Sequence, residues 1–239
     1  MQLREVFVTP LPAAIVFDLD GTIIDTESAE FSAVQRVWAD HGIDFPESRW
    51  AHVIGLPANE PWIAALEAEV GHPLDHEEIH QRQRRYNTEY LAGVDARPGV
   101  RELIAAATAA ALPLAIASNA PTWWIERRLE SLDLLGSFSH LIGVDIAAAP
   151  KPDPAPFRQA CQALGVSPAQ AVAIEDSCVG VRSAVAAGLF TVGCPGPLTL
   201  GHDLSVAHWL VDSHHEITLS ALGARLWGGG APEGLASMS

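Results

Sequence analysis

Two aspartates, Asp18 and Asp20, stand two positions apart directly after the apolar run of residues 13–17. A short apolar run bounded by a glycine turn predicts a buried strand, and reactive groups of open α/β sheets gather at the carboxyl ends of strands. Residues two apart in an extended segment face the same side, and Gly21 lets the backbone turn beside them. Because two carboxylates repel each other without a cation, this spacing indicates a cation site, although the four residues alone are equally typical of a plain turn.

Polar residues also follow three later apolar runs. They are Ser118 and Asn119 after residues 112–117, Lys151 in the loop after residues 141–144, and Glu175 and Asp176 after residues 171–174. Taken singly, such residues are typical of helix caps or solvated loop charges. Their recurrence in order, each at the end of a strand, favours one shared site.

The elements that must position these groups alternate between strand and helix. Helices are expected over residues 100–111, 122–132, 157–164 and 179–187, and two weaker strands over residues 190–192 and 209–211. Strands alternating with helices predict a parallel sheet covered on both faces, and right-handed crossovers bring the strand ends to a common edge. We therefore expect all four polar groups to meet at that edge.

Residues 28–95 have a different character, because their apolar residues recur at helical spacing, as in Phe31, Val34 and Trp38. We predict a small helical cap inserted into the core as a lid over the crevice of the two aspartates. The expected organisation is core over residues 1–27 and 96–228, cap over 28–95, and a disordered tail over 229–239.

The composition limits the possible partners. The 239 residues are 49% hydrophobic, and 14 Lys and Arg stand against 29 Asp and Glu, a formal charge of −15. This charge repels nucleic acid and anionic membranes, so neither is expected as a partner, and an anionic substrate needs a local positive group such as Lys151. The oligomeric state is left open.

Cysteine usage and the first residues indicate a cytoplasmic protein. Cys161, Cys178 and Cys194 are odd in number and share no C-x-x-C spacing, which suits reduced thiols. The first dozen residues lack the pattern of a signal peptide, and no apolar run approaches the ~20 residues of a membrane span.

The whole string from Asp18 to Glu27, D-x-D-G-T followed by two apolar residues and D-T-E, resembles the first motif of the haloacid dehalogenase (HAD) superfamily. Ser118-Asn119, Lys151-Pro-Asp-Pro and the stretch from Ile174 to Gly188 are similar to its second, third and fourth motifs. The resemblance implies a Rossmann-like doubly wound core with an inserted helical cap, and an enzyme, most often a phosphohydrolase.

The same resemblance implies roles for individual residues. Asp18 would be the nucleophile that forms an aspartyl phosphate, and Asp20 the acid and base for the leaving oxygen and for water. Mg²⁺ would be held by Asp18, the backbone carbonyl of Asp20, and Asp176. Ser118, Asn119 and Lys151 would bind phosphate, Glu175 would support the metal through water or pair with Lys151, and Thr22 would support the turn.

Physical chemistry independently favours this assignment. A carboxylate that attacks a phosphate dianion meets like-charge repulsion, which Mg²⁺ on hard oxygen ligands and a lysine relieve. A hydroxyl and a backbone N–H can donate to the equatorial oxygens, which carry charge in the loose transition state of phosphoryl transfer.

The helical insert resembles the cap of β-phosphoglucomutases and phosphoglycolate phosphatases, and Gly55-Leu-Pro57 resembles the cap loop that faces the active site. The mutase branch usually has a His where Glu30 stands and an Arg where residues 58–60 follow, and both departures favour a phosphatase. Asp20 argues against carbon–halogen cleavage, because the dehalogenase branch lacks the second aspartate.

We therefore predict a Mg²⁺-dependent phosphatase that acts on a small phosphorylated metabolite, such as a sugar phosphate or phosphoglycolate. A phosphosugar mutase and a non-catalytic phosphometabolite-binding protein are the alternatives. The ten histidines, His214 among them, are expected at the surface or in the cap, and Trp123 and Trp124 in the core.

Overall fold

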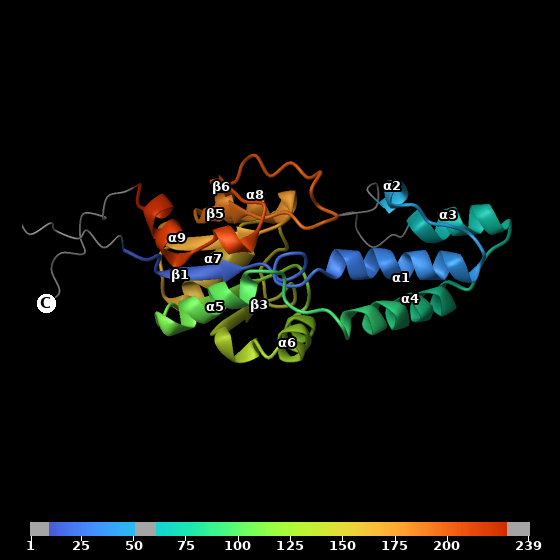
Figure 1. Cartoon of the computed structure of the whole chain (residues 1–239), viewed down its shortest axis with the longest axis horizontal. Coiled ribbons are helices and arrows are strands. Elements are labelled where there is room, and N and C mark those ends of the chain that lie inside the picture. The colour runs from blue at the N-terminus through green and yellow to red at the C-terminus, as the bar shows by residue number, and fades with distance from the viewer. Residues whose placement is uncertain (1–9, 51–60, 229–239) are drawn as a thin grey trace, which may run out of the picture. The chain divides into compact units, whose positions relative to one another are not determined.

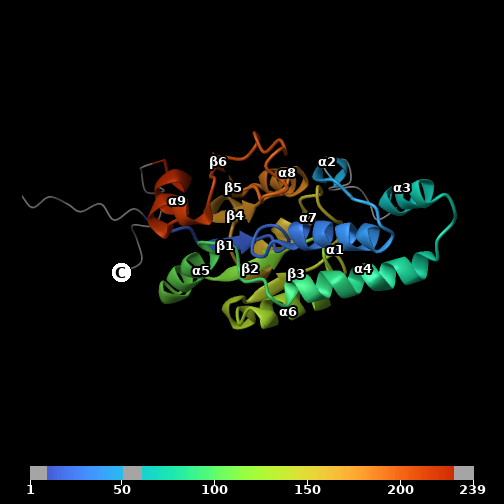
Figure 2. The ribbon, with the colours of Figure 1, turned by 45° about the vertical axis from the view of Figure 1, so that its right-hand side comes forward.

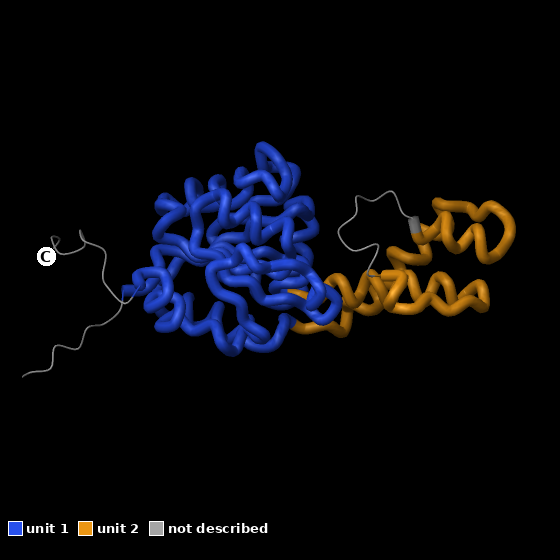
Figure 3. The backbone as a smooth tube through the Cα atoms, turned by 90° about the horizontal axis from the view of Figure 1, so that it is seen from above, with its two compact units in different colours: residues 1–23, 96–239 blue, residues 24–95 orange. Residues whose placement is uncertain are grey.

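The computed structural model describes residues 10–50 and 61–228. The chain divides into two compact units, residues 1–23 with 96–239 and residues 24–95 (Figure 3). The cap loop expected at Gly55–Pro57, the neighbouring residues 58–60 and the tail expected over 229–239 lie outside the described residues.

The first unit is built on a parallel sheet of six strands in the order β3-β2-β1-β4-β5-β6 (Figure 1), which confirms the predicted doubly wound α/β core. The strands are β1 (Ala14–Phe17), β2 (Leu114–Ala117), β3 (His140–Ile142), β4 (Ala171–Glu175), β5 (Phe190–Gly193) and β6 (Trp209–Leu210). Every residue of β1, β2 and β4 is buried, as expected for strands covered on both faces.

The first unit also contains helices, which lie between the strands in the chain except for the last, which follows β6. They are α5 (Val100–Ala109), α6 (Thr122–Ser131), α7 (Ala155–Leu164), α8 (Cys178–Ala187) and α9 (Leu219–Leu226), with short 3-10 turns at Leu135–Ser137, Pro168–Gln170 and His214–Glu216. Helices α5 and α7 lie on opposite faces of the sheet (Figure 2), as right-handed crossovers to either side of β1 require. Phe157 of α7 belongs to one buried cluster with the small side chains of Ala115 and Ala173, which lie on the strands that α7 covers.

The register of the central strands determines which groups meet at the carboxyl edge. Phe17 is aligned with Ile116 on one side and with Ile174 on the other. The backbone N–H of Asp18 donates to the carbonyl of Ile174 at 3.0 Å. The first residues beyond β1, β2 and β4 are therefore neighbours.

The second unit is helical, as predicted for the insert. It contains α1 (Thr26–Asp40), α2 (Glu47–Trp50), α3 (Pro61–Val70) and α4 (His76–Leu91). Asp25 caps α1 by accepting from the N–H of Ser28 at 3.0 Å, and Trp38 packs inside against Phe45 with ring centroids 4.9 Å apart. No helix in the described part of the chain is both long and apolar enough to cross a membrane.

Arg97 joins segments that are distant in the sequence within the first unit. Its guanidinium donates to the backbone carbonyls of Gly21, Cys194 and Pro195, the last two at 3.1 and 2.8 Å. It thereby ties the turn after β1 to the segment after β5. The position of the turn that follows Asp18 and Asp20 thus depends on a side chain from another part of the chain.

We expect Arg97→Met to lower the free energy of unfolding by about 2–4 kcal/mol, because three backbone carbonyls lose a charged donor. Urea denaturation at fixed pH measures the change. Arg127→Met, which alters an exposed arginine of α6, is the matched control and should stay within about 0.5 kcal/mol of wild type. Equal effects of the two substitutions would show that the carbonyls do not need Arg97.

Candidate active site

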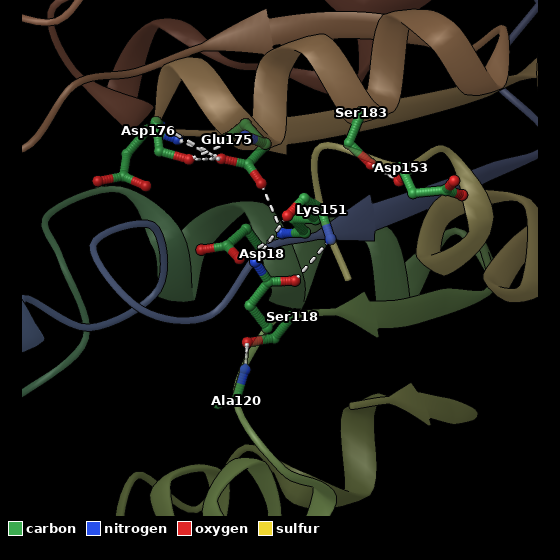
Figure 4. Close-up of polar contacts among 11 residues, drawn as sticks. Asp18, Ser118, Ala120, Lys151, Asp153, Glu175, Asp176 and Ser183 are labelled. Carbon is green, nitrogen blue, oxygen red and sulfur yellow. Dashed lines mark hydrogen bonds and ion pairs between the residues drawn. The ribbon is translucent and has the colours of Figure 1, made fainter. Parts of the chain in front are cut away.

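Lys151 lies between two acidic side chains at the carboxyl edge of the sheet (Figure 4). Its ammonium nitrogen Nζ is 2.6 Å from Asp18 Oδ1 and 2.6 Å from Glu175 Oε1. Asp18 follows β1, Glu175 ends β4, and all three side chains are buried. The lysine therefore joins the ends of two adjacent strands through a buried ion-pair network.

Glu175 is fixed at both of its carboxylate oxygens. Oε1 accepts from Lys151, while Oε2 accepts from the backbone N–H groups of Asp176 and Ser177 at 3.1 and 3.2 Å and from the Ser177 hydroxyl at 3.0 Å. Gly180 provides the space, because a Cβ atom there would lie 1.7 Å from Oε1. Glu175 thus positions Lys151, and Lys151 in turn holds Asp18.

Burial, helped by the nearby carboxylates of Glu175 and Asp20, raises the pKa of Asp18 from 3.8 to about 7 against the opposing effect of Lys151. Burial by itself lowers the pKa of Lys151, but the carboxylates of Asp18 and Glu175 outweigh it and raise that pKa above its usual value. The lysine therefore stays protonated. The site holds more negative charge than its lysine balances.

Three carboxylates at this edge of the sheet lie close enough together to share a cation. Oxygen atoms of Asp18, Glu175 and Asp176 lie within 4.8 Å of one another, and all three residues are buried. Asp18 Oδ2 is buried and has no hydrogen-bond partner among the described residues. Hard oxygen ligands of this kind suit a divalent cation such as Mg²⁺, so the donor set fits the metal that the sequence motifs imply.

Asp176 lies against the turn after β1. A Cβ atom on Gly21, whose φ is +82°, would lie 2.1 Å from Asp176 Oδ2. The hydroxyl of Thr199 is 3.3 Å from the same oxygen and is buried. Glycine is therefore required at position 21 both for the backbone conformation and for the space that Asp176 occupies.

Ser118 and Asn119 lie at the end of β2, the strand on the other side of β1. Ser118 Oγ accepts from the N–H of Ala120 at 2.9 Å, which leaves its own hydrogen for a ligand. The Asn119 side chain instead bonds the backbone of Lys151, receiving its N–H at 2.8 Å and donating to its carbonyl at 3.2 Å. Asn119 therefore holds the lysine loop with its side chain, a contact that the sequence did not indicate.

Asp20 makes a contact that sequence reasoning missed. Its Oδ1 accepts from the indole Nε1 of Trp124 at 3.0 Å. The expectation that Trp123 and Trp124 are core residues is wrong for Trp123, which is 59% exposed, and Trp124 is only partly buried.

Thr22, in the turn after β1, is fully buried, and its hydroxyl has no partner among the residues described.

The expectation that the histidines lie at the surface or in the cap is wrong for His214. This side chain is buried in the first unit, with Nδ1 3.5 Å from the sulfur of Cys194. Burial lowers its pKa to about 3, and burial also raises the pKa of Cys194 to about 11. Both groups are therefore neutral near pH 7 and belong to the core.

A parallel α/β core with a buried lysine–carboxylate site at the ends of its central strands defines a class of enzyme. The model of the haloacid dehalogenase-like hydrolase family matches residues 15–194, and the chain belongs to that family. This confirms both the family and the enzyme class predicted from the motifs.

Known relatives include enzymes of two activities. The phosphorylated carbohydrates phosphatase of Thermotoga maritima is 32% identical over 179 residues, which cover 74% of this chain and 82% of the relative. The β-phosphoglucomutase of Bacillus subtilis is 32% identical over 204 residues, covering 81% and 88%. A solved HAD family hydrolase of Deinococcus radiodurans with bound phosphate and sodium is 26% identical, with a TM-score of 0.76 over 91% of this chain and 98% of that one.

The raised pKa of Asp18 gives a pH dependence of stability in the metal-free protein. Because the folded chain binds this proton more tightly than the unfolded chain, the stabilisation is present below pH 3.8 and is lost as the pH rises through about 7. Between pH 5 and pH 8, we expect the free energy of unfolding of wild type to fall by about 2–3 kcal/mol relative to that of Asp18→Asn. Urea denaturation in EDTA measures the change.

The control for this experiment is Asp133→Asn. Asp133 is exposed and has a positive φ of 54°, which asparagine also tolerates. The free energy of unfolding of Asp133→Asn should equal that of wild type at every pH. A curve for Asp18→Asn that runs parallel to wild type would contradict the perturbed carboxyl.

Proposed function

We propose that this protein is a Mg²⁺-dependent phosphatase that hydrolyses a small phosphorylated metabolite, such as a sugar phosphate or phosphoglycolate, through a phosphorylated Asp18. The main observation in its support is how the two carboxylate oxygens of Asp18 are held. One of its oxygens is held by Lys151 at 2.6 Å, and the other is buried without a partner among the described residues. A carboxylate fixed in this way is oriented to attack through its second oxygen.

Asp18, the backbone carbonyl of Asp20, and Asp176 would hold Mg²⁺. When bound, the ion neutralises charge between the carboxylate and the incoming phosphate dianion. Asp18 and Asp176 are both buried, and their carboxylate oxygens lie within 4.8 Å of each other, which supports this assignment. Glu175 remains with Lys151, because both of its oxygens already accept hydrogen bonds.

Three donors then bind the phosphoryl oxygens. They are the Ser118 hydroxyl, the backbone N–H of Asn119, and the ammonium of Lys151. Asp18 attacks phosphorus while the bond to the ester oxygen breaks, and Asp20 gives its proton to that oxygen. Water then attacks the phosphorus of the aspartyl phosphate, Asp20 takes a proton from it, and inorganic phosphate leaves as the Asp18 carboxylate is regenerated.

A phosphorylated carbohydrate is the substrate class that the relatives favour, since one relative bears that substrate in its name and a solved relative holds phosphate. The match to a β-phosphoglucomutase makes a phosphosugar mutase the second candidate. Glu30, which stands where the mutase branch has a histidine, accepts hydrogen bonds from Gln83 and, at 2.8 Å, from Asn87 within the helical unit. This use of Glu30 as a structural acceptor supports the phosphatase.

Three unpaired cysteines support a reducing, cytoplasmic setting.

Phosphate release from sugar phosphates, phosphoglycolate and p-nitrophenyl phosphate, with Mg²⁺ or with EDTA, tests the proposal. We expect release only with Mg²⁺ and a loss of at least about a thousandfold in Asp18→Asn, because the nucleophile is removed. Asp133→Asn is again the matched control, with unchanged rates. The preferred ester would define the substrate class.

Other outcomes would contradict the proposal in distinct ways. Isomerisation of a glucose phosphate that depends on a sugar bisphosphate, with little free phosphate, would identify a mutase. Binding of phosphate esters without turnover would identify a binding protein. Release that persists in Asp18→Asn would exclude Asp18 as the nucleophile.

A further inference from the structure

We propose that Trp124 is a positioning residue for Asp20, holding one carboxyl oxygen through its indole N–H so that the other oxygen carries the transferred proton. This inference rests on the proposed phosphatase function and deepens it, because it assigns a proton donor's geometry to a residue of α6. The observation is the 3.0 Å hydrogen bond from Trp124 Nε1 to Asp20 Oδ1.

The indole makes this contact directional. Its N–H is a donor and has no acceptor function, so Asp20 Oδ1 must accept whether the carboxyl group is ionised or protonated. The carbonyl oxygen of a carboxylic acid accepts hydrogen bonds better than its hydroxyl oxygen does, so a protonated Asp20 favours the proton on Oδ2. A hydroxyl or a water at the same place could either donate a hydrogen bond to Asp20 or accept one from it, so the proton could then lie on either oxygen.

The indole ring of Trp124 also packs against two neighbouring side chains of the same helix. The guanidinium of Arg128, one turn further along α6, lies 4.7 Å from the ring centroid, and the ring of Trp123 meets it edge-on with centroids 6.0 Å apart. Arg128 is buried, as is its neighbour Leu129, so this turn of the helix is anchored in the core. A cation over the face of tryptophan stabilises such a stack.

The start of α6 is fixed as well. Asp145, in the segment after β3, accepts from the backbone N–H of Thr122 at 2.8 Å and from its hydroxyl at 2.9 Å. The N–H that reaches Asp20 therefore comes from a helix whose first turn and inner face are both held. Such support is what a pre-oriented acid–base group requires, since a small displacement of the donor slows proton transfer.

Two esters distinguish this role from a structural one. Proton donation matters for a sugar phosphate, whose alkoxide is a poor leaving group, and little for p-nitrophenyl phosphate, whose phenolate leaves unprotonated. We expect Trp124→Phe, which keeps the ring and removes the N–H, to lower kcat/KM for the sugar phosphate about 10–100-fold and for p-nitrophenyl phosphate less than about threefold. KM should change little.

The comparison is made on one enzyme preparation, so the ratio of the two rates does not depend on how much of the variant is folded. Because kcat/KM covers only the steps up to loss of the leaving group, the later hydrolysis of the phosphoenzyme does not enter. Trp227→Phe, which removes an indole N–H that donates to the backbone carbonyl of Leu11 instead, is the matched control and should leave the ratio at the wild-type value.

A second measurement uses the Asp20→Asn background. There Trp124→Phe should cause no further loss with the sugar phosphate, because the group that it positions is gone. Equal losses on both esters, or a loss that persists in Asp20→Asn, would overturn the positioning role while leaving a phosphatase in place. Wild type without Mg²⁺-dependent release from either ester would instead overturn the proposed function and this inference together.

Discussion

The structure depends on the burial of three carboxylates beside one lysine. Asp18, Glu175 and Asp176 lie within 4.8 Å of one another, and Lys151 pairs with the first two. Buried charge of one sign is unfavourable unless protons or cations compensate it, and the rise of the Asp18 pKa to about 7 is the direct result. A divalent cation would compensate this buried negative charge. Phosphoryl transfer to a carboxylate requires the same compensation, because the carboxylate and the phosphate are both anionic.

The sheet is what brings these groups together. The alignment of Phe17 with Ile116 and Ile174 sets the ends of β1, β2 and β4 side by side, and glycine at positions 21 and 180 leaves room for carboxylates where a Cβ would clash. The turn beyond β1 is held from elsewhere in the first unit, by Arg97, which lies just before α5, and by Trp124 of α6, which follows β2. The buried carboxylates thus lie at strand ends, and their surroundings are fixed by side chains from other segments of the first unit.

Sequence reasoning predicted the strand ends well, because buried parallel strands are continuous apolar runs and the polar residue that ends each run is easily recognised. The same reasoning failed where a role depends on what lies opposite a side chain. Nothing local distinguishes Trp124, which donates to Asp20, from Trp123, which is exposed. Buried His214 likewise has ordinary neighbours in sequence, and no helix was predicted from the sequence where α9 lies. Such contacts join residues up to 104 positions apart, so only the fold defines them.

The most direct test of the account is to trap a phosphoryl group on Asp18. In Asp20→Asn with Mg²⁺ and p-nitrophenyl phosphate, the first step needs no proton donor, whereas hydrolysis of the phosphoenzyme lacks its base. We predict a burst of about one p-nitrophenolate per protein molecule, and reduction of the quenched protein with borohydride should convert residue 18 to homoserine. Steady turnover without a burst, or a phosphoryl group on a residue other than Asp18, would contradict the account.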